Sequence, residues 1–520
     1  MSWDPPGLPN HAPPPPAAEA DGYGAQQGYG IEAPEVHVEI LPALPTDRRK
    51  TLSTPKDAKP RTAREAKFVH FATKKFALCD VSCLEALLFA LYVGLNLLWA
   101  TVLRPNGSVA DAFGYLASAN GLFVVIPASR NSLWAWLLGL PFDKTIAIHR
   151  WLGRLVFVEV TLHMVLYFTS GYTTVGGMFS YTKYRNGFFS WVALLVVFCT
   201  SLEYLRRKKY QLFYTLHFAF LFFYLFAGLH TPRFAFYGYL ALIIYGADKL
   251  QRIVRGRSSK RRVEKVELIA NGEILRVSIL KPNCTYPQLG QYVFLNFPEI
   301  SKWEWHPYTL ASSPLEEYME VDIKKLGDHT QKLLESHQRG AKPWVCIDGP
   351  YGRVVINPRR YRSIVFVCGG IGVTPMISML RWFYLVNTPP ALAAKQSVHL
   401  AEYIYFVWVV DNIATYDVFK STILACVERS KQPDFPTLVP LIHVTREEPN
   451  PAQYGLEHQC VRKGRPDIAH TLGSIKANGI RRHAVYFCGP KALCNATWHA
   501  TTTLSDETVQ FAFHHETFEF

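Results

Sequence analysis

The sequence lacks several patterns that would assign it to a common class of protein. Its ten cysteines are dispersed without a CxxC pair, which argues against a cysteine-rich zinc site and against a small disulfide-stapled domain. Residues 1–66 contain neither a segment that resembles a cleaved signal peptide nor a D-x-D-x-D-G calcium loop. The net charge of +14 could indicate a nucleic-acid partner. We exclude nucleic acid because the basic residues cluster at the ends of apolar segments.

Apolar periodicity is also missing from residues 1–66, which hold the run Pro13–Pro16 and then a stretch rich in Gly, Tyr and Gln. Such a composition predicts a disordered cytosolic tail. The prolines can form a polyproline II ligand for a cytosolic partner, and the simpler alternative is a solvated tail without one.

Long apolar segments are what the sequence does have. A segment of about 20 apolar residues can cross a bilayer, and six segments qualify: 77–103, 112–129, 145–170, 187–204, 211–230 and 234–251. They predict a six-helix transmembrane bundle over residues 67–255. Lys and Arg accumulate before the first segment, between the fourth and fifth, and after the sixth, which predicts that both termini are cytosolic. We therefore expect an integral protein in the lipid bilayer of the plasma membrane.

Two of these segments each carry two histidines, and an ionisable side chain at membrane depth is expected to be functional. The third segment carries His149 and His163, and the fifth carries His217 and His230. The spacings of fourteen and thirteen residues correspond to helix rises of about 21 and about 19.5 Å. If the two helices face each other, His149 pairs with His217 and His163 with His230. The pattern predicts two stacked bis-histidine haems, and the alternative is four unrelated histidines near the lipid headgroups.

The two spacings differ in their position around a helix. His149 and His163 lie within about 40° of each other, whereas the other two histidines differ by about 140°. The fifth segment is therefore predicted to be tilted, kinked or irregular, with Gly228 as the candidate position. With cytosolic termini, His149 and His217 form the inner pair, nearer the cytosol, and His163 and His230 form the outer pair. Arg150 and Arg154 stand beside the inner pair, where they either contact haem propionates or extend to the cytosolic interface.

The composition changes after residue 261. Within residues 262–357 the short alternating segments VEKVELIA, EILRVSIL and YVFLNFP predict an antiparallel β-barrel. In the following segment HPYT, Tyr308 can stack on a flat ring system and Thr309 can hydrogen-bond its edge. The segment KKLGDHTQKL predicts a glycine turn and then a helix start that can hold a pyrophosphate. DGPYG, at residues 348–352, predicts a tight turn that ends the barrel.

Residues 361–520 begin with SIVFVCGGIGVTP, which predicts a buried strand, a glycine-rich turn and a helix, as in a Rossmann-like α/β nucleotide domain. Further strands are predicted at YIYFVWVV, LVPLIHVT and HAVYFCGP. After the second of these, Thr445 and Arg446 can hold a ribose 2′-phosphate. Cys488-Gly489-Pro490 ends the last strand at the crevice where a nicotinamide should lie.

From about residue 80 to residue 520 the chain resembles the ferric reductase and NADPH oxidase superfamily. The four histidines match the spacing of that family's haem ligands, and HPYTLASSP resembles its flavin motif. GGIGVTP and FCGP resemble its nicotinamide motifs, and Thr445-Arg446 resembles the pair that reads the 2′-phosphate in ferredoxin reductases. The ending ETFEF is similar to a family terminus whose last ring covers the flavin. Five motifs that follow the histidines in the same order as in the family make the resemblance specific.

The resemblance implies an enzyme that passes electrons from cytosolic NADPH through FAD and two b-type haems to an acceptor on the far side of the membrane. It implies haem iron as the metal, with axial ligands His149, His163, His217 and His230. The implied FAD contacts are His306, Pro307, Tyr308, Thr309, Lys324, His329, Thr330 and Phe518. The implied NADPH contacts are Gly369, Gly370, Gly372, Thr374, Pro375, Thr445, Arg446, Cys488, Gly489 and Pro490. Cys488, beside the nicotinamide, and Phe520, over the flavin, are the implied catalytic positions. A haem sensor without turnover is disfavoured because the electron-input module is complete.

The electron acceptor stays open. Asp111 and Tyr167 stand where the superfamily's oxidases carry Arg and His, which favours a metalloreductase acting on chelated Fe³⁺ or Cu²⁺. The alternative is an NADPH oxidase that reduces O₂ to superoxide, which the short loops, the six-span length and the segment SSPLEEYMEV favour. The nucleotide is open as well, because Arg446 favours NADPH whereas Asp411 favours the 2′-hydroxyl of NADH.

Overall fold

The computed structural model describes residues 75–76, 79–103, 108–130, 142–281, 289–325, 327–338, 343–352, 361–385 and 401–516. The tail of residues 1–66 lies outside these ranges, so its predicted disorder stays a prediction.

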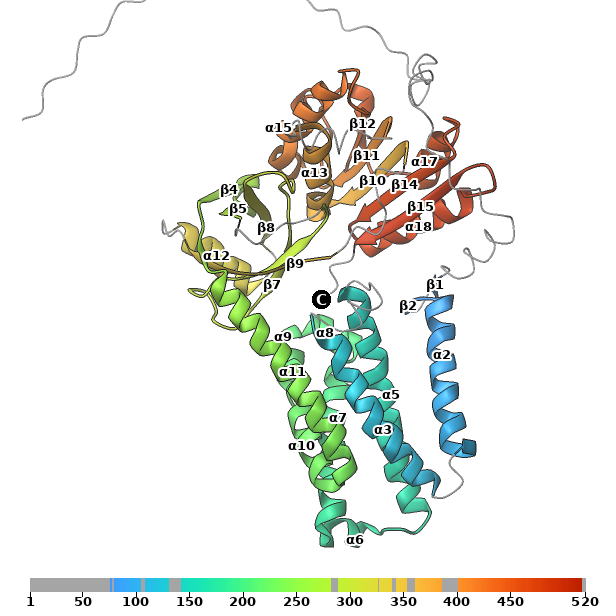
Figure 1. Cartoon of the computed structure of the whole chain (residues 1–520). Helices are drawn as coiled ribbons and strands as arrows, with labels where there is room; N and C mark the ends of the chain where they lie inside the picture. Colours follow the sequence, from blue (N-terminus) through green and yellow to red (C-terminus); the bar gives the residue numbers. More distant parts are fainter. Residues whose placement is uncertain are drawn as a thin grey trace, which may run out of the picture. The chain divides into compact units, whose positions relative to one another are not determined.

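The first part of the described chain is helical, as expected for apolar segments whose backbone groups must be paired internally in a bilayer. After the short strands β1 (Lys75–Phe76) and β2 (Cys79–Ser82), the elements are α2 (Cys83–Leu98), η2 (Trp99–Leu103), α3 (Val109–Val125), η3 (Ile126–Ala128), α5 (Phe142–Thr169), α6 (Val175–Ser180), α7 (Thr182–Thr200), α8 (Glu203–Lys208), α9 (Tyr210–His217), α10 (Phe220–His230) and α11 (Pro232–Ser258). Helix α3 packs against α5 and α11, and α10 packs against α7 and α11. Figure 1 shows these helices running alongside one another. Their shared core contains Val156, Leu194, Phe223, Tyr224 and Ala241.

Four of the described helical segments are long and apolar enough to cross a membrane: Cys83–Val102, Val109–Ala128, Lys144–Thr169 and Tyr210–His230. Helices α7 and α11 occupy the other two predicted positions but are more polar. The first turn of α7 contains Lys183 and Arg185, and α11 contains Arg233, Asp248 and Lys249. Because such charges are costly in hydrocarbon, membrane helices are confirmed, whereas a bundle of six is not.

The fifth predicted segment is irregular, as its histidine spacing predicts. The α-helix stops at His217 and restarts at Phe220, so the break lies at residues 218–219. The predicted position at Gly228 is wrong because this residue lies inside α10. A Cβ atom at Gly228 would lie 2.8 Å from the Tyr239 hydroxyl, so the glycine allows α10 and α11 to pack closely.

The strands predicted after residue 261 are confirmed. They form two sheets, so the predicted closed barrel is not confirmed. One antiparallel sheet has the order β4 (Lys265–Ile269), β5 (Ile274–Leu280), β8 (Tyr318–Lys324). The other has the order β3 (Arg261–Arg262), β9 (Trp344–Tyr351), β6 (Tyr292–Asn296), β7 (His306–Thr309). Alternating side chains from both sheets bury one core, which includes Val277, Val293, Val321 and Ile347. The segment also contains η4 (Ala270–Gly272) and α12 (Asp328–Gln338), whose start directly after Gly327 confirms the predicted helix start.

The tight turn predicted at residues 348–352 is wrong. Asp348 to Tyr351 belong to β9, which keeps pairing with β6. Phe294 pairs with Asp348 and Tyr292 with Tyr351, so Gly349 and Pro350 form a bulge in the strand. Gly349 has a φ of +143°, which glycine adopts without steric cost. Glycine and proline therefore bend this strand instead of ending it.

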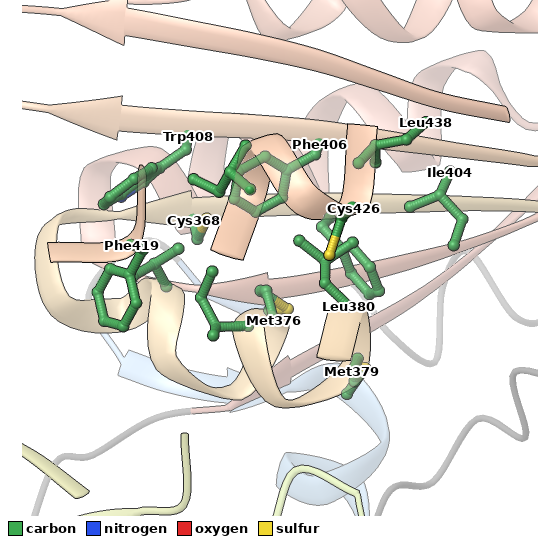
Figure 2. Close-up of a cluster of buried hydrophobic side chains, with 14 of the residues drawn as sticks. Cys368, Met376, Met379, Leu380, Ile404, Phe406, Trp408, Phe419, Cys426 and Leu438 are labelled. Atoms are coloured by element: carbon green, nitrogen blue, oxygen red, sulfur yellow. The ribbon is translucent and has the colours of Figure 1, made fainter. Parts of the chain in front are cut away.

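Residues 363–516 form a parallel α/β domain, as predicted. Its elements are β10 (Ser363–Gly369), η6 (Gly370–Val373), α13 (Thr374–Leu380), η7 (Arg381–Leu385), β11 (Tyr403–Val410), α15 (Ile413–Ser430), β12 (Thr437–Val444), α16 (Pro451–Tyr454), η8 (His458–Cys460), β13 (Val461–Lys463), α17 (Ile468–Lys476), β14 (Arg482–Cys488), α18 (Lys491–Leu504) and β15 (Gln510–Glu516). The strand order is β13-β12-β11-β10-β14-β15, with every pair parallel. Figure 2 shows part of its core, where Cys368, Met376, Phe406 and Trp408 meet between the sheet and α13.

Candidate functional site

The histidines predicted to bind haem lie on α5, α9 and α10. In three of them Nδ1 lies within hydrogen-bond distance of a main-chain carbonyl: His149 at Val124 (2.9 Å), His163 at Ala110 (2.6 Å) and His230 at Lys183 (2.7 Å). Because a carbonyl oxygen only accepts hydrogen bonds, each of these rings carries a proton on Nδ1 and keeps the Nε2 lone pair. A histidine that binds a metal through Nε2 needs this tautomer.

The same histidines lie together in the pairs that their spacing suggests. The ring centroids of His149 and His217 are 6.1 Å apart, and those of His163 and His230 are 6.2 Å apart. Two imidazoles on opposite sides of one iron, with Fe–N bonds of about 2.0 Å and about 1.1 Å from nitrogen to ring centre, would have centroids about 6 Å apart. Both pairs therefore fit the axial ligands of a haem.

Two glycines provide room for the outer pair. A Cβ atom at Gly114 on α3 would lie 3.0 Å from the His163 ring, and one at Gly187 on α7 would lie 2.9 Å from the His230 ring. Sequence reasoning did not single out either residue, since isolated glycines in apolar helices carry no specific signal. It also missed Ser201, whose hydroxyl lies 3.2 Å from Nδ1 of His217 and replaces the main-chain carbonyl used by the other three histidines.

A tyrosine and an aspartate lie beside the outer pair. The Tyr167 ring is 4.8 Å from the His163 ring, and its hydroxyl donates to Asp111 Oδ1 at 2.5 Å. The Ser108 hydroxyl donates to the other carboxylate oxygen at 2.8 Å. Asp111 directly follows Ala110, whose carbonyl holds His163. The two positions that bear on the acceptor are thus in contact with each other and next to a candidate haem ligand.

A cavity of about 1620 Å³ connects His149 and His217 with the flavin and nicotinamide motifs. His149 and His217 line it, together with cationic side chains at Arg130, Arg150, Arg154, Arg206, Lys249 and Arg252. Arg150 and Arg154 thus line the same cavity as His149 and His217, where their guanidinium groups would be available to the carboxylates of a haem. His163 and His230 do not line this cavity.

All the predicted flavin contacts that the structure describes line this cavity: His306, Pro307, Tyr308, Thr309, Lys324, His329 and Thr330. The His306 and His329 rings lie 4.0 Å apart. Burial, and then the neighbouring His306, lower the pKa of His329 to about 4, so its ring is neutral at pH 7. Burial also lowers the pKa of His306, although Glu304, 3.5 Å away, opposes this shift. Ligand-type atoms of Glu304, His306 and His329 lie within 4.8 Å of one another, between the start of the flavin motif and α12.

The glycine-rich turn after β10 packs against the end of β14. A Cβ atom at Gly372 would lie 2.6 Å from the Cys488 carbonyl oxygen, and one at Gly369 would lie 2.7 Å from Pro490. These glycines are therefore needed for the contact between the two loops, in addition to the predicted approach of a phosphate. Strand β10 lies between β11 and β14, where the strand order reverses, and ligands of open α/β sheets bind at such a position.

The predicted nucleotide contacts divide into two groups. Those that line the cavity are Gly369, Gly372, Thr374, Cys488, Gly489 and Pro490. Gly370, Pro375, Thr445 and Arg446 do not line it. The Thr445 hydroxyl donates to Val410 O at 3.1 Å, whereas the Arg446 side chain is 78% exposed and lies 3.9 Å from Asp411. The predicted contacts Phe518 and Phe520 fall outside the described residues.

Apolar helices with paired histidines, followed by two antiparallel sheets and a parallel α/β domain around one cavity, define a membrane-anchored oxidoreductase with a nucleotide domain. Family models match three parts of the chain: a ferric reductase like transmembrane component at residues 113–228, an FAD-binding domain at 258–355 and a ferric reductase NAD binding domain at 361–453. The chain belongs to the ferric reductase and NADPH oxidase superfamily.

Curated relatives come from both branches of the superfamily. The chain is 29% identical to ferric reduction oxidase 2 of Arabidopsis thaliana, over 55% of this chain and 40% of that protein. It is 24% identical to a superoxide-generating NADPH oxidase heavy chain of Dictyostelium discoideum, over 78% of this chain and 88% of that protein. It is 26% identical to NADPH oxidase 1 of Rattus norvegicus, over 71% and 73%. The match thus spans about two-fifths of the Arabidopsis relative and most of the Dictyostelium one.

Proposed function

We propose that this chain moves electrons from NADPH across a membrane to a chelated ferric or cupric ion, through FAD and two b-type haems. The observation that supports this most is the single cavity lined by His149 and His217, by the flavin motif and by the nicotinamide motifs. A bound flavin would supply the change from two-electron to one-electron chemistry, and bound haems would carry single electrons through the bilayer.

Each group of residues has a defined part in this proposal. Tyr308 and Thr309 would orient the flavin, and Gly369, Gly372 and Cys488 would position the nicotinamide against it. The four histidines would hold two haem irons through Nε2, with Nδ1 fixed as described. With two histidines for each iron, neither haem iron would have a free position for the acceptor. The acceptor would therefore receive its electron at the edge of the outer haem and not by binding to the haem iron.

The membrane arrangement belongs to the same proposal. Helices α7 and α11 would join the four apolar segments to complete a six-helix domain over residues 67–255. Both termini would be cytosolic in a plasma-membrane protein, and the proline-rich tail of residues 1–66 could bind a cytosolic partner. The flavin and nucleotide domains would occupy residues 262–357 and 361–520.

The choice of a metal acceptor rests on Asp111 and Tyr167 beside His163. Reduction of O₂ creates an anion at the haem edge, and a nearby carboxylate opposes that charge. Reduction of a ferric or cupric centre adds the same negative charge, but before reduction the carboxylate attracts a cationic centre, whereas it gives neutral O₂ no such attraction. The pair therefore favours a metal over oxygen.

Superoxide production is the second candidate. The alignment with the superoxide-generating heavy chain of Dictyostelium covers 88% of that protein, a larger share than for the Arabidopsis ferric reduction oxidase. In this case O₂ would replace the metal chelate as acceptor, and the electron path would be unchanged.

An acceptor assay on the purified full chain tests both candidates. The protein is first loaded with FAD and haem. One sample is given NADPH and a ferric chelate under argon, and a second is given NADPH and a superoxide-sensitive dye under air. We expect iron reduction under argon at a rate that accounts for NADPH consumption. Superoxide formation that accounts for all NADPH consumed in air, with no iron reduction under argon, would make the chain an oxidase.

The variant Asp111→Asn tests why the acceptor is chosen. It keeps the size of the side chain and removes its charge, so we expect the ratio of iron reduction to superoxide formation to fall. Glu203→Gln is the matched control, because Glu203 is an exposed acid on α8, paired with Arg207. An equal ratio in both variants would show that the Asp111 charge does not select the acceptor.

A further inference from the structure

One face of α13 contacts both the cofactor cavity and the flavin-side sheets. Thr374 and Ser378 on α13 and Arg381, the first residue of η7, which directly continues that helix, follow one another at intervals of four and three residues, so they lie on the same side. Thr374 lines the cavity directly after the glycine-rich turn. The Ser378 hydroxyl donates to Ser312 O at 2.7 Å in a buried contact. The helix thus contacts the proposed nicotinamide position at one end and the last residues of the flavin motif further along.

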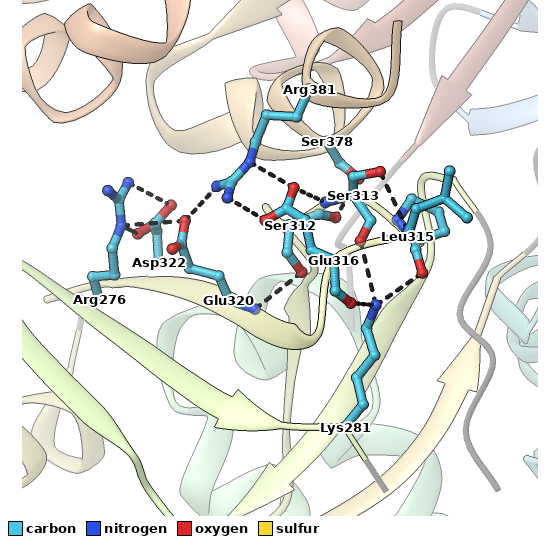
Figure 3. Close-up of polar contacts among 11 residues, drawn as sticks. Arg276, Lys281, Ser312, Ser313, Leu315, Glu316, Glu320, Asp322, Ser378 and Arg381 are labelled. Atoms are coloured by element: carbon cyan, nitrogen blue, oxygen red, sulfur yellow. Dashed lines mark hydrogen bonds and ion pairs between the residues drawn. The ribbon is translucent and has the colours of Figure 1, made fainter. Parts of the chain in front are cut away.

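Arg381 makes the strongest of these contacts. Its guanidinium donates through Nε to Glu316 Oε1 at 2.9 Å and through a terminal nitrogen to Glu320 Oε1 at 2.8 Å. A further bond joins it to the second carboxylate oxygen of Glu316. Figure 3 shows the side chain reaching from its helix toward both glutamates. The three side chains are only 16–26% exposed, so water screens this pairing less than it does a surface pair.

The segment that Arg381 holds contains the end of the flavin motif and the residues directly after it. Residues 311–316 come after β7, which ends at Thr309. From the flavin side, Lys281 donates to Pro314 O at 2.8 Å and also to Glu316 O. Within the segment, Ser313 N donates to Glu316 Oε1 at 2.8 Å. The segment is therefore fixed by a cation from each domain (Figure 3).

A second arginine reaches in the opposite direction, from the flavin-side sheets to the nucleotide domain. Arg276 on β5 donates to Asp322 at 2.7 and 3.3 Å, and it also donates to Val418 O on α15 at 3.4 Å. Asp322 lines the cofactor cavity. Ile274, at the start of the same strand, packs in the core of the nucleotide domain. The charges of three cations and three carboxylates thus cancel at the boundary between the domains: Arg276, Lys281, Arg381, Glu316, Glu320 and Asp322.

We propose that Arg381 is a positioning residue for hydride transfer, which fixes how the glycine-rich turn presents the nicotinamide to the flavin. The inference rests on the proposed transfer from NADPH to FAD and holds for either acceptor. In that step a hydride leaves C4 of the nicotinamide, which is oxidised by two electrons, and joins N5 of the flavin, which is reduced by two. Arg381 does not line the cofactor cavity. It acts through Ser378 and Thr374 on one side and through residues 312–316 on the other.

The test compares Arg381→Met with Arg362→Met in the full chain, loaded with FAD and without oxygen. Arg362 pairs with Glu402 through two bonds of 2.7 Å, but this pair lies inside the nucleotide domain and is 54% and 35% exposed. We measure flavin bleaching at saturating NADPH, NADPH affinity, and the long-wavelength absorbance of the stacked nicotinamide and flavin. A misplacement of about 1 Å can slow a reaction roughly 100-fold, so for Arg381→Met we expect bleaching to slow by about 10- to 100-fold, with weaker absorbance and unchanged affinity.

Two further variants keep the test decisive if Arg381→Met folds poorly. Ser378→Ala removes one neutral hydrogen bond and should slow bleaching in the same direction but less. Arg381→Lys keeps the charge without the planar fork and should recover part of the rate. Bleaching as fast as in Arg362→Met, or an affinity loss that matches the rate loss, would overturn the positioning role. A wild type whose flavin is not bleached by NADPH would instead reject the proposed function.

Discussion

The membrane helices and the nucleotide domain prepare their candidate cofactor contacts in opposite ways. In the helices, three of the four histidines are held at Nδ1 by main-chain carbonyls. In the nucleotide domain, the Arg446 side chain is 78% exposed and forms a distant ion pair, 3.9 Å from Asp411. A metal ligand needs one tautomer and one ring orientation before the metal binds. A side chain that grips a dissociable nucleotide phosphate must instead leave water each time the nucleotide binds.

The largest effect is expected where an anchored histidine is removed. His217→Ala deletes one proposed axial ligand of the inner haem, so the haem content should fall from two to one per chain, measured as the pyridine haemochromogen. His443→Asn is the matched control. His443 is also buried, and burial lowers its pKa to about 4, but it lies on β12. One haem in the wild type, or haem loss in the control, would break the distinction between the two groups of histidines.

The next effect concerns the exposed arginine. Arg446→Ala removes a charge-assisted contact to the 2′-phosphate worth about 1.5–3 kcal/mol, so the KM for NADPH should rise by roughly 10- to 150-fold. The KM for NADH, which has no 2′-phosphate, should change little. Arg362→Ala, directly before β10, serves as the control. Equal effects on both nucleotides would place the 2′-phosphate elsewhere and leave Asp411 to select NADH.

The sequence predicted the parts of this molecule that follow from periodicity and spacing. Predicted strands such as YIYFVWVV coincide with β11, and the turn after β10 lies where SIVFVCGG places it. The spacing of His217 and His230 correctly required an irregular helix. These features depend on local patterns, which a single chain displays directly.

Features that depend on tertiary contacts could not be predicted. The break at residues 218–219 falls in a uniformly apolar stretch, and Gly349-Pro350 bends β9 only because β6 continues beside it. Three of the four histidines are anchored by main-chain carbonyls, which no residue type signals. Arg381 also looks ordinary in the sequence, because its partners Glu316 and Glu320 lie some sixty residues earlier.

Ser201 makes one histidine an exception in the membrane half, because the Nδ1 partner of His217 is a side chain. Outer hydrogen-bond partners of metal ligands typically change metal affinity by about 10- to 100-fold. We therefore expect Ser201→Ala to release the inner haem more readily by roughly that factor, measured as haem transfer to apomyoglobin. Ser190→Ala, on the preceding helix α7 and bonded to Phe223 O, should retain its haem as the wild type does. Equal retention in both variants would show that His217 needs no partner at Nδ1.

The smallest effect is expected from a buried histidine of the nucleotide domain to which we assign no cofactor. The His483 ring is fully buried on β14, stacks on Phe511 and bonds to the Ser363 hydroxyl at 2.8 Å. Burial lowers its pKa to about 4, although a backbone bond to Ile480 opposes the shift. The unfolded chain protonates near pH 6.5, so the stability from a neutral His483 is complete above that pH and is lost as the pH falls toward 4.

Between pH 7.5 and pH 5 this histidine should lower the free energy of opening of β14 by about 2 kcal/mol, a factor of roughly 30. Amide hydrogen exchange of β14 in the full chain, corrected for the intrinsic rate, measures it. His483→Asn keeps a polar group near Ser363 and removes the titration. The fall in the free energy of opening of β14 between pH 7.5 and pH 5 should therefore be about 2 kcal/mol smaller in this variant. The control His470→Asn alters an exposed histidine and should follow the wild type. If His483→Asn loses as much protection as His470→Asn, the acid sensitivity belongs to other buried histidines, such as His443 and His514, whose pKa values burial also lowers to about 4.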